Sequence, residues 1–456
     1  MFHEDVKLRG LLITNVHTVD GKKGDLGLRD LLLTDGIIAQ IAPAGKLALH
    51  VTSTKTSYPQ EQVSDSHENL LVIDGTGLTA FPGLIDPHVH FRDPGQAEKE
   101  DITTGARAAA RGGFTSVIMM GNTVPRIDTP DIIRDVINRG KNTGINVYTC
   151  ANVTKGMEGK ELVDMDACIE AGAVLFTDDG LPVRDEAVMR LACEEAAKRG
   201  KAISLHEEDS AFVTEAGINA GAIAKEMGLT GASREAEIRM VERDIKIAEE
   251  TGCAITVQHI SAAESVELIR QAVQKAEAAG TKRLIHAEAT PHHFSLTEDA
   301  VRIHGTCAKM NPPLREERDR LAIIEGLRDN TIDMIATDHA PHTPEEKARE
   351  FTKAPSGITG LETSLAYAVK ELVQPHILTL PALACKMSYN AALLYGLDAG
   401  TIEVGAPADV TLFDMNGTWT FDETVSKSSN TPFLHETLPA PVRYTICGGR
   451  VVYRDT

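Results

Sequence analysis

Residues 173–205 read AVLFTDDGLPVRDEAVMRLACEEAAKRGKAISL, and this stretch decides the fold class. An apolar run at 173–176 comes first. Residues 185–199 then show a helical period, with apolar residues on one face and Glu, Lys or Arg on the other. A second apolar run follows at 202–205. A strand, a helix and another strand in this order predict parallel strands joined by a crossover helix.

The same alternation extends on both sides of this unit, from about residue 81 to residue 396. Helical segments at 234–251 and 262–279 repeat the pattern of 185–199. Eight runs read as strands, at 83–85, 116–120, 146–149, 173–176, 202–205, 254–258, 283–287 and 334–336. Eight such units predict an α/β protein with a (β/α)8 TIM-type barrel, which we assign to residues 79–396.

Both ends of the chain have β-like character instead. Short apolar runs occur before the barrel at 11–13, 31–33, 37–41 and 70–73, and after it at 401–404, 409–413, 419–421 and 444–453. The polar stretch at 43–69 reads as a long surface excursion between strands. Because neither terminal segment is long enough to be stable alone, we expect residues 1–78 and 397–456 to form one small β-sandwich-like domain that flanks the barrel.

The charge balance excludes one class of partner. The chain has 456 residues, with 46 Lys and Arg against 66 Asp and Glu, so its formal net charge is −20. Nonspecific nucleic-acid binding needs Lys and Arg to replace counterions along the phosphates, so we expect no nucleic-acid partner. An anionic small substrate stays compatible if a few cations lie in the site. No apolar stretch approaches the roughly 18 residues of a membrane-spanning helix, so we expect no membrane partner.

Cysteine usage and the first residues indicate a location. The seven cysteines are scattered without CxxC spacing, so neither a disulfide framework nor a zinc knuckle is indicated. The first ten residues carry several charges before any apolar run, unlike a signal peptide. We therefore expect a cytoplasmic protein.

The strongest local signal is DPHVHFRDPG at residues 86–95, directly after the first predicted barrel strand. Residues two apart on a strand point to the same side, so His88 and His90 project together from its carboxyl end. Barrel enzymes place their sites there. Two such imidazoles can hold a metal ion such as zinc. Paired histidines at a strand end are also found as solvated polar residues, and HxH alone does not separate the two interpretations.

Further metal-ligand residue types close other predicted strands. Asp178-Asp179 follows the run at 173–176, His206 follows 202–205, His259 follows 254–258, and Asp338 follows 334–336. Convergence from so many strand ends is unexpected for scattered surface residues. Six ligands exceed what one tetrahedral site needs, so two metal ions that share a carboxylate fit this set better.

These segments together resemble one family. The stretches HVHFRDPG, FTDDG, LHEED, QHIS, MNPPLR, ATDHAPH and SKSSNTPF are similar to those of dihydroorotases of the amidohydrolase superfamily, of the type in which Asp replaces a metal-bridging carboxylated lysine. The resemblance runs through the barrel into the C-terminal segment. It implies two zinc ions per chain, one held by His88, His90 and Asp338, the other by His206 and His259, with Asp179 as the bridge.

Two nearby residues are excluded as the bridge. Asp178 reads as a solvated turn or a helix cap, because the resemblance favours the 27-residue step from Asp179 to His206. Lys201 begins its strand, so it lies at the opposite face of the barrel. The resemblance also gives Asp338 a catalytic role as the proton acceptor.

Arg92 indicates that the substrate carries a carboxylate. It lies two residues after His90, and its guanidinium suits a carboxylate bidentately. The alternative is an exposed Arg in a surface salt bridge. The resemblance adds His90, Asn122, Asn311, His342, Ser356 and Gly357 as substrate contacts. This chain departs from the family at Gly121, where relatives usually have Pro, and at Ser356, where they generally have Phe. The pair His292-His293 follows a predicted strand. Its side chains either reach the mouth of the barrel or belong to a polar loop.

The resemblance implies reversible hydrolysis of L-dihydroorotate to N-carbamoyl-L-aspartate, a step of de novo pyrimidine biosynthesis. Allantoinase and hydantoinase are alternatives, although allantoinases tend to carry Asn where this chain has Arg92 and hydantoinases lack the Arg. A catalytically silent scaffold for aspartate carbamoyltransferase is a third alternative, but such chains lose metal ligands. A homodimer, and a complex with aspartate carbamoyltransferase alongside activity, stay open.

Overall fold

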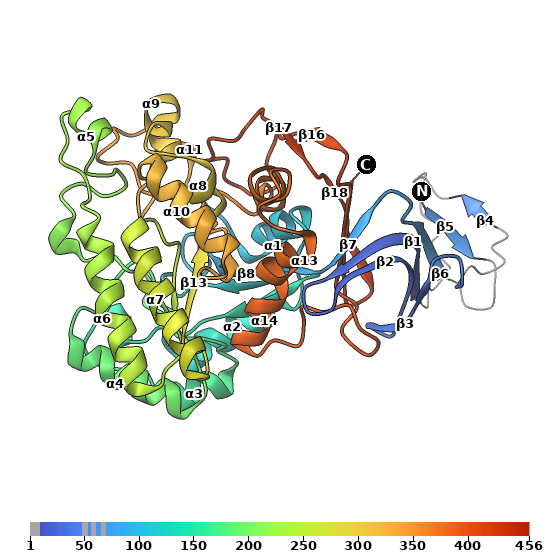
Figure 1. The fold of residues 1–456 in the computed structure, drawn as a ribbon, viewed down its shortest axis with the longest axis horizontal. Helices are drawn as coiled ribbons and strands as arrows, with labels where there is room; N and C mark the ends of the chain where they lie inside the picture. Colours follow the sequence, from blue (N-terminus) through green and yellow to red (C-terminus); the bar gives the residue numbers. More distant parts are fainter. Residues whose placement is uncertain (1–9, 48–52, 56–60, 65–69, 456) are drawn as a thin grey trace.

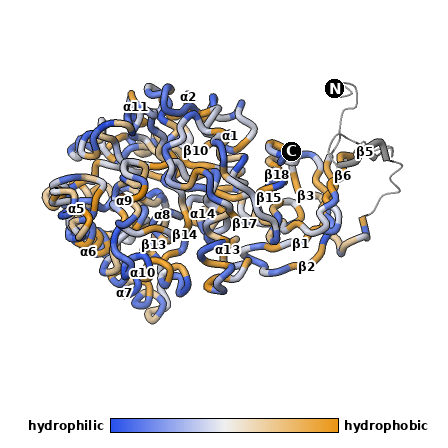
Figure 2. The backbone as a smooth tube through the Cα atoms, turned by 90° about the horizontal axis from the view of Figure 1, so that it is seen from above, coloured by the Kyte–Doolittle hydropathy of each residue, from blue (hydrophilic) through white to orange (hydrophobic). Residues whose placement is uncertain are grey.

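The computed structural model of the chain describes residues 10–47, 53–55, 61–64 and 70–455. A body of helices around short parallel strands stands beside a twisted sheet, which lies at the right of Figure 1. The same two parts lie side by side in the perpendicular view of Figure 2. The barrel and the flanking β domain predicted from the sequence are therefore both present in outline.

The barrel wall is built from two groups of parallel strands. The first holds β8 (Leu84–Val89), β9 (Phe114–Met119) and β10 (Asn146–Thr149), and the second holds β11 (Ile203–Leu205), β12 (Ile255–Val257), β13 (Ile285–Ala289) and β14 (Met334–Ile335). Bridges from Phe176 to Ala151 and Ile203 join the two groups on one side. A bridge from His339 to Val89 joins them on the other, so eight wall positions close into a ring.

The prediction of a regular strand at 173–176 is wrong, but the segment occupies the expected position in the barrel wall. Its backbone bonds to both neighbours, with Val174 N–H donating to Thr149 and Phe176 N–H donating to Ala202. Only Phe176 forms bridges, because the pairing changes partner within four residues. Asp178 and Asp179 follow directly after this position.

Helices cover the wall from outside. The predicted helices are confirmed within about one residue as α4 (Glu186–Lys198), α6 (Glu235–Thr251) and α7 (Ala263–Ala279). In α4, the Asp185 side chain accepts from the N–H groups of Ala187 and Val188 and so caps the helix. The other α-helices are α1 (Ile102–Arg111), α2 (Pro130–Gly140), α3 (Met165–Ala171), α5 (Ala222–Glu226), α8 (Pro291–Ser295), α9 (Ala300–His304), α10 (Glu317–Arg328), α11 (Pro344–Lys347), α12 (Ser364–Ala368), α13 (Leu380–Ala384) and α14 (Asn390–Tyr395).

Both ends of the chain join one sheet. Its strands are β1 (Gly10–Asp20), β2 (Gly24–Thr34), β3 (Ile37–Pro43), β4 (Ser53–Lys55), β5 (Glu61–Ser64), β6 (Leu70–Asp74), β7 (Thr79–Pro82), β15 (Val410–Phe413), β18 (Val442–Cys447) and β19 (Arg450–Arg454). The strand β7 pairs with β1 on one side and with β15 on the other, and this links the two ends. The division at residues 78 and 397 stays a prediction, and β7 lies just after the first boundary.

Three expectations for the ends are corrected. The stretch at 43–69 is not wholly irregular, because β4 and β5 pair within it. Residues 401–404 form no strand, since Ile402 N–H bonds to the side chain of Asp20 instead of to a neighbouring strand. The run at 419–421 contributes to β16 (Thr418–Thr420), which pairs with β17 (Thr437–Pro439) outside the terminal sheet. Within the described residues, no helix is long and apolar enough to cross a membrane.

Candidate active site

The carboxyl ends of the barrel strands bring the six predicted metal ligands together. His88 lies near the end of β8, and His90 follows it. Asp179 leaves the wall just after Phe176. His206, His259 and Asp338 follow β11, β12 and β14. All six side chains are buried. The parallel direction of the strands explains the convergence, because their carboxyl ends share one rim.

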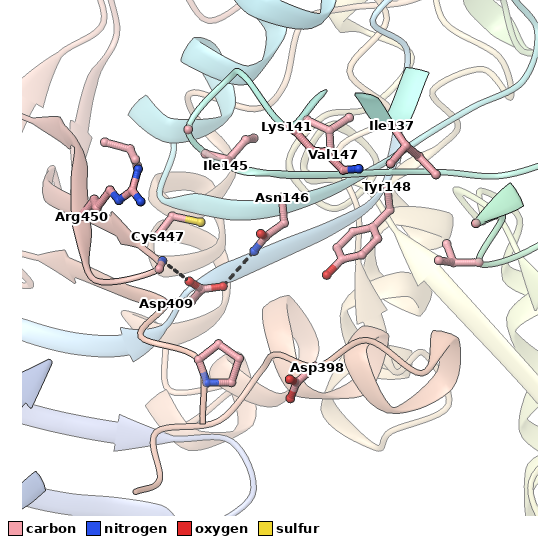
Figure 3. Close-up of a pocket in the computed structure, with 16 residues that line it drawn as sticks. Ile137, Lys141, Ile145, Asn146, Val147, Tyr148, Asp398, Asp409, Cys447 and Arg450 are labelled. Atoms are coloured by element: carbon pink, nitrogen blue, oxygen red, sulfur yellow. Dashed lines mark hydrogen bonds between the residues drawn. The ribbon is translucent and has the colours of Figure 1, made fainter. Parts of the chain in front are cut away.

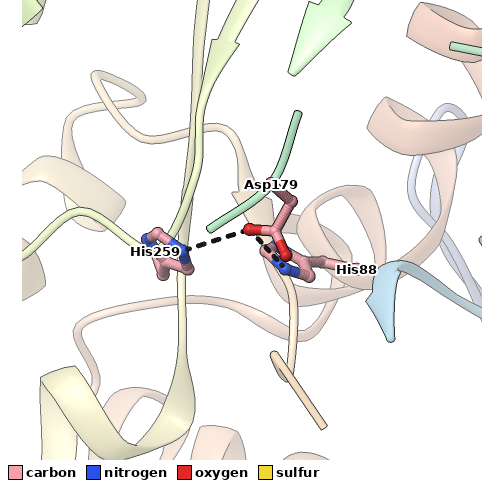
Figure 4. Close-up of side chains that lie close together, drawn as sticks. All are labelled: His88, Asp179 and His259. Carbon is pink, nitrogen blue, oxygen red and sulfur yellow. Dashed lines mark ion pairs between the residues drawn. The ribbon is translucent and has the colours of Figure 1, made fainter. Parts of the chain in front are cut away.

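Asp179 lies at the centre of this cluster. One of its oxygens, Oδ1, is 3.6 Å from Nε2 of His88, 3.7 Å from Nδ1 of His206 and 3.9 Å from Nε2 of His259. Its other oxygen, Oδ2, is 3.4 Å from Nε2 of His90. Figure 4 shows the carboxylate between His88 and His259. A carboxylate that faces four imidazoles with both oxygens has the arrangement needed to bridge two cations.

Asp338 stands over the HxH pair. Its Oδ1 is 2.9 Å from Nε2 of His90 and 3.5 Å from Nε2 of His88. His88, His90 and Asp338 offer ligand atoms that all lie within 4.8 Å of one another, and so do His88, Asp179 and His259. These two groups share His88, and neither includes His206, which the prediction places with His259 on the second metal ion.

Hydrogen bonds select which nitrogen of each histidine is free. Nδ1 of His88 is 2.6 Å from Oε1 of the buried Glu288, and Nδ1 of His90 is 3.0 Å from Oδ1 of Asn122. Since those oxygens accept, the Nδ1 atoms carry hydrogen, and the Nε2 atoms face the cluster. Nε2 of His88 is buried without a hydrogen-bond partner among the described residues. Such an orphaned acceptor fits a metal ligand.

His206 and His259, the predicted ligands of the second metal ion, turn nitrogen atoms toward each other. Nδ1 of His206 lies 3.0 Å from Nε2 of His259, with ring centroids 4.8 Å apart. Nδ1 of His259 is buried without a hydrogen-bond partner in the described part of the chain. Two imidazole lone pairs at this spacing repel unless a proton or a cation lies between them.

The charges of the cluster are strongly coupled. Burial lowers the pKa of His88, but Asp179 and Glu288 outweigh this effect and raise it well above its ordinary value. Burial would raise the pKa of Asp179, yet the surrounding histidines, His88 first, hold it well below its usual range. Burial, His206 and His88 lower the pKa of His259. Asp179 is thus an anion that cationic neighbours stabilise.

Three residues at this rim of the barrel have a strained backbone conformation. Arg92, His259 and Asp338 have positive φ angles of 57°, 32° and 47°. For a residue other than glycine, such a conformation costs about 1–3 kcal/mol and persists only where the surroundings impose it. Their clustering at one rim is typical of a functional site.

A cavity of about 200 Å³ opens beside the cluster. All seven predicted substrate-contact residues line it, namely His90, Arg92, Asn122, Asn311, His342, Ser356 and Gly357. Asp179, His206, His259 and Asp338 line it too, whereas His88 lies behind them. The cavity therefore gives a small molecule access to the predicted metal ligands.

Arg92 does not sit in a surface salt bridge. It is half-buried, its Nε donates to the carbonyl of Pro341 at 3.3 Å, and its Nη2 lies 3.4 Å from Nε2 of His342. Both partners are neutral or weakly basic, so the guanidinium charge is available to an anion that enters the cavity.

A larger cavity of about 730 Å³ lies elsewhere (Figure 3). Asn146 opens β10, so this cavity lies at the amino end of that strand, away from the metal ligands. Its buried carboxylate, Asp409, already accepts from Asn146 and from the N–H of Gly448. The larger of these two cavities is therefore not the one that the predicted metal ligands line.

Comparison with known proteins decides the family. A family profile described as Dihydro-orotase-like matches residues 77–265. The chain is 51% identical to a dihydroorotase of Clostridioides difficile (strain 630) over 390 residues, which covers 86% of this chain and 91% of that protein. It is 43% identical to a dihydroorotase of Lactococcus lactis subsp. lactis (strain IL1403), over 97% of this chain and 99% of that one. The chain belongs to the dihydroorotase family. It is accordingly a hydrolase of cyclic amides.

Solved structures support the fold of this dihydroorotase-family chain. An L-hydantoinase (dihydropyrimidinase) from Arthrobacter aurescens superposes with a TM-score of 0.82 at 23% identity, covering 98% of this chain and 96% of that one. A D-hydantoinase (dihydropyrimidinase) from Thermus sp. gives 0.79 at 23% identity, over 98% and 95%. At such low identity the likeness concerns the fold, and it confirms the predicted barrel with a flanking β domain.

The two departures from the dihydroorotase pattern have local explanations. A Cβ atom at Gly121 would lie 2.6 Å from Nδ2 of Asn152, so a Pro there would require Asn152 to move. The Ser356 hydroxyl donates to Oδ1 of Asn311 at 3.1 Å. A polar contact thus stands where relatives have an aromatic ring.

Other residues singled out in the sequence have structural roles. Asp178 is buried, not solvated, and accepts from the N–H groups of Val153 and Thr154. Burial raises its pKa to about 6. His293 is a buried link within the loops, with Nε2 3.0 Å from the carbonyl of Pro312. Neither residue touches the metal ligands through a described hydrogen bond.

One residue of the site was missed in the sequence. Glu288 is buried on β13 and orients His88, but it stands between alanines in a short strand. A carboxylate between two alanines of a strand is a signal in itself, because a buried charge needs a partner.

Proposed function

We propose that this chain hydrolyses L-dihydroorotate reversibly to N-carbamoyl-L-aspartate, in the pyrimidine biosynthetic pathway. The observation that carries the proposal is the pairing of the Asp179 cluster with Arg92 in one cavity. The cluster suits hydrolysis of a ring amide, and Arg92 suits the carboxylate that dihydroorotate bears and that simpler cyclic amides lack. The dihydroorotases to which the chain is similar support the same reading.

We propose two zinc ions as the cofactor. His88, His90 and Asp338 would hold one, His206 and His259 the other, and Asp179 would bridge them. The free nitrogens described above fit this assignment, since histidine and carboxylate are ligands that zinc prefers. When bound, such ions lower the pKa of water toward neutrality and polarise a carbonyl oxygen.

Asp338 is the proposed proton carrier. Its carboxylate lines the cavity and lies among the ligands, so it can accept a proton from the attacking water. It then delivers that proton to the ring nitrogen as the amide bond breaks. In ring closure the same carboxylate removes a proton from the carbamoyl nitrogen, because each step runs in reverse.

The remaining cavity residues orient the substrate. Arg92 and His342 stand together on one side, where they suit the exocyclic carboxylate. Asn122 donates to the Asp179 carboxylate at 3.0 Å and to the Asp179 carbonyl at 3.3 Å, and it lines the cavity together with Arg92. Asn311, Ser356 and Gly357 line the same cavity, with Ser356 next to His342, and they suit the ring amide groups. His90 borders both groups. Binding through the non-reacting carboxylate positions the scissile bond.

An ultraviolet assay tests the activity. The purified chain should consume dihydroorotate, lose this activity after dialysis against a chelator, and recover it with zinc. Hydantoin and allantoin should be poor substrates in the same assay. Faster turnover of either alternative ring would reject the proposed substrate, and chelator-resistant activity would reject the metal.

The Arg92→Ala variant tests the recognition of the carboxylate. Loss of a charged hydrogen bond costs about 1.5–3 kcal/mol, so kcat/KM for dihydroorotate should fall about 10- to 150-fold. Activity on dihydrouracil, which lacks the carboxylate, should change little. Equal losses on both rings would contradict the proposed role of Arg92.

Location and assembly stay predictions. The seven cysteines are free in the structure, which supports a reducing cytoplasm. A homodimer and a complex with aspartate carbamoyltransferase are compatible with an active barrel.

A further inference from the structure

Two buried lysines hold one stretch of backbone beside the substrate cavity. Nζ of Lys309 donates to the carbonyls of Phe351 at 2.6 Å and Ala354 at 2.7 Å. Nζ of Lys347 donates to the carbonyls of Pro355 at 2.9 Å and Gly357 at 3.0 Å. The two lysines are only 4% and 6% exposed. Their ammonium groups are thus desolvated and satisfied by carbonyl oxygens.

Two more side chains bind the same stretch. Asn430 donates to the carbonyl of Gly357 at 3.0 Å, and Nε2 of His342 lies 2.8 Å from the carbonyl of Ser356. We call residues 354–357 the cavity loop. It belongs to no helix or strand, yet each of its four carbonyls accepts a hydrogen bond from a side chain. Its conformation therefore depends on these donors.

The lysine contacts determine where the next N–H points. In a trans peptide the C=O and the following N–H point in opposite directions. With the Pro355 carbonyl on Lys347, the N–H of Ser356 is directed away from that lysine, which does not line the cavity. Ser356 does line it. Its N–H donates to no acceptor within the described residues.

An ammonium group is well suited to this task. It has three donors and no acceptor, so it can bind only the carbonyl side of a peptide. A side-chain amide in its place could turn over and accept from an N–H instead. The two lysines therefore hold the loop in one of its two peptide orientations.

We propose that Lys347 and Lys309 are positioning residues, which fix the cavity loop so that the N–H of Ser356 donates to an oxygen of the bound cyclic amide. This inference rests on the proposed function. The lysines do not touch the reacting atoms, so their loss should affect substrate binding more than the chemical step.

The Lys347→Met variant tests the inference, because Met has a similar length and no donor. KM for dihydroorotate should rise about 10- to 100-fold, the change expected for lost charged hydrogen bonds, with kcat within about threefold and zinc content unchanged. Hydrogen exchange of the peptide spanning 351–358 should quicken. Lys347→Arg keeps a donor-only cation and should restore part of the affinity.

The chain offers a matched control in Lys353. It lies in the same stretch, but its side chain is 70% exposed and pairs with Glu350 at 2.7 Å. Lys353→Met removes the same charge and should leave KM and exchange unchanged.

The possible outcomes separate the inference from the proposed function. Unchanged exchange in Lys347→Met overturns the anchoring of the loop, and faster exchange with unchanged KM overturns the positioning of substrate. A wild-type chain inactive on dihydroorotate overturns the proposed function alone, since exchange needs no turnover. If Lys347→Met does not fold, Lys309→Met applies the same criteria through the carbonyls of Phe351 and Ala354.

Discussion

At the residue scale, Asp338 combines two properties that a proton carrier needs. It contacts His90, a proposed metal ligand, with 2.9 Å between its Oδ1 and Nε2 of His90, and it also lines the cavity. Its positive φ of 47° shows that the surroundings hold it there against a local preference. A carboxylate placed in this way can serve the metal and the substrate together.

The Asp338→Asn variant should separate these two tasks. An amide keeps the shape and one ligand oxygen but accepts no proton at neutral pH, so kcat should fall about 100- to 10,000-fold. Most of the zinc should stay bound, since five ligands remain. Steady-state kinetics and metal analysis of the same sample check both points. Near-normal turnover would remove Asp338 from its catalytic role.

Glu288 acts through His88. Its carboxylate accepts the Nδ1 hydrogen at 2.6 Å and thereby directs the Nε2 lone pair toward the cluster. Glu288→Gln has almost the same shape but can present its N–H₂ to the imidazole, so zinc affinity should fall about 10- to 100-fold. Competition with a fluorescent chelator measures this loss. Glu298→Gln is a control, because Glu298 is buried but bonds to Asn219 instead of to a metal ligand. Equal affinity in both variants would refute the role.

At the element scale, the strand ends explain what the sequence predicts well. Parallel strands with polar residues just beyond their last apolar position must gather those residues at one rim, so the cluster follows from the βα pattern. Glu288 does not follow this rule, because it lies inside β13 and not beyond its end. Lys347, at the end of α11, and Asn430, in a loop, contact the cavity loop without lying at a strand end. Such contacts leave no periodic pattern in the sequence.

The short helix α8 carries a pH-dependent contact. His293 is buried, and its bond to the carbonyl of Pro312 needs one ring hydrogen. Burial lowers its pKa from 6.5 to about 4. The folded state therefore binds fewer protons than the unfolded state below pH 6.5. The stability from this group is complete above that pH and is lost as pH falls toward 4, by about 2 kcal/mol between pH 7 and pH 5.

Urea unfolding of wild type and His293→Gln at pH 7, 6 and 5 tests this contact. Gln does not titrate and keeps a donor, so the free energy of unfolding should fall about 2 kcal/mol less in the variant over this range. His435→Gln provides the comparison, because the side chain of His435 is 76% exposed. Parallel curves for wild type and His293→Gln would contradict the assignment.

At the scale of the whole molecule, the proposed metal ions would make the site of this acidic chain locally cationic. The formal net charge is −20, yet two bound divalent ions and Arg92 would outweigh the carboxylates of Asp179 and Asp338. The overall negative charge then disfavours binding of nucleic acid, while the local charge of the site favours an anionic substrate. Composition could predict the first of these properties, and only the convergence of the strand ends predicts the second.

Metal removal should therefore weaken the whole barrel. The proposed ligands follow wall positions on both sides of the bridges that close the ring, so bound zinc would link the two strand groups. A ligand that binds only the folded state at a free concentration 100 times its Kd adds about 2.7 kcal/mol per site. Thermal unfolding should shift down by several degrees after chelation and return with two zinc ions per chain. Asp179→Asn should show a much smaller response, because the bridge is weakened. A wild-type chain that unfolds at the same temperature with and without chelator, or that binds one zinc at saturation, would contradict a bridged pair.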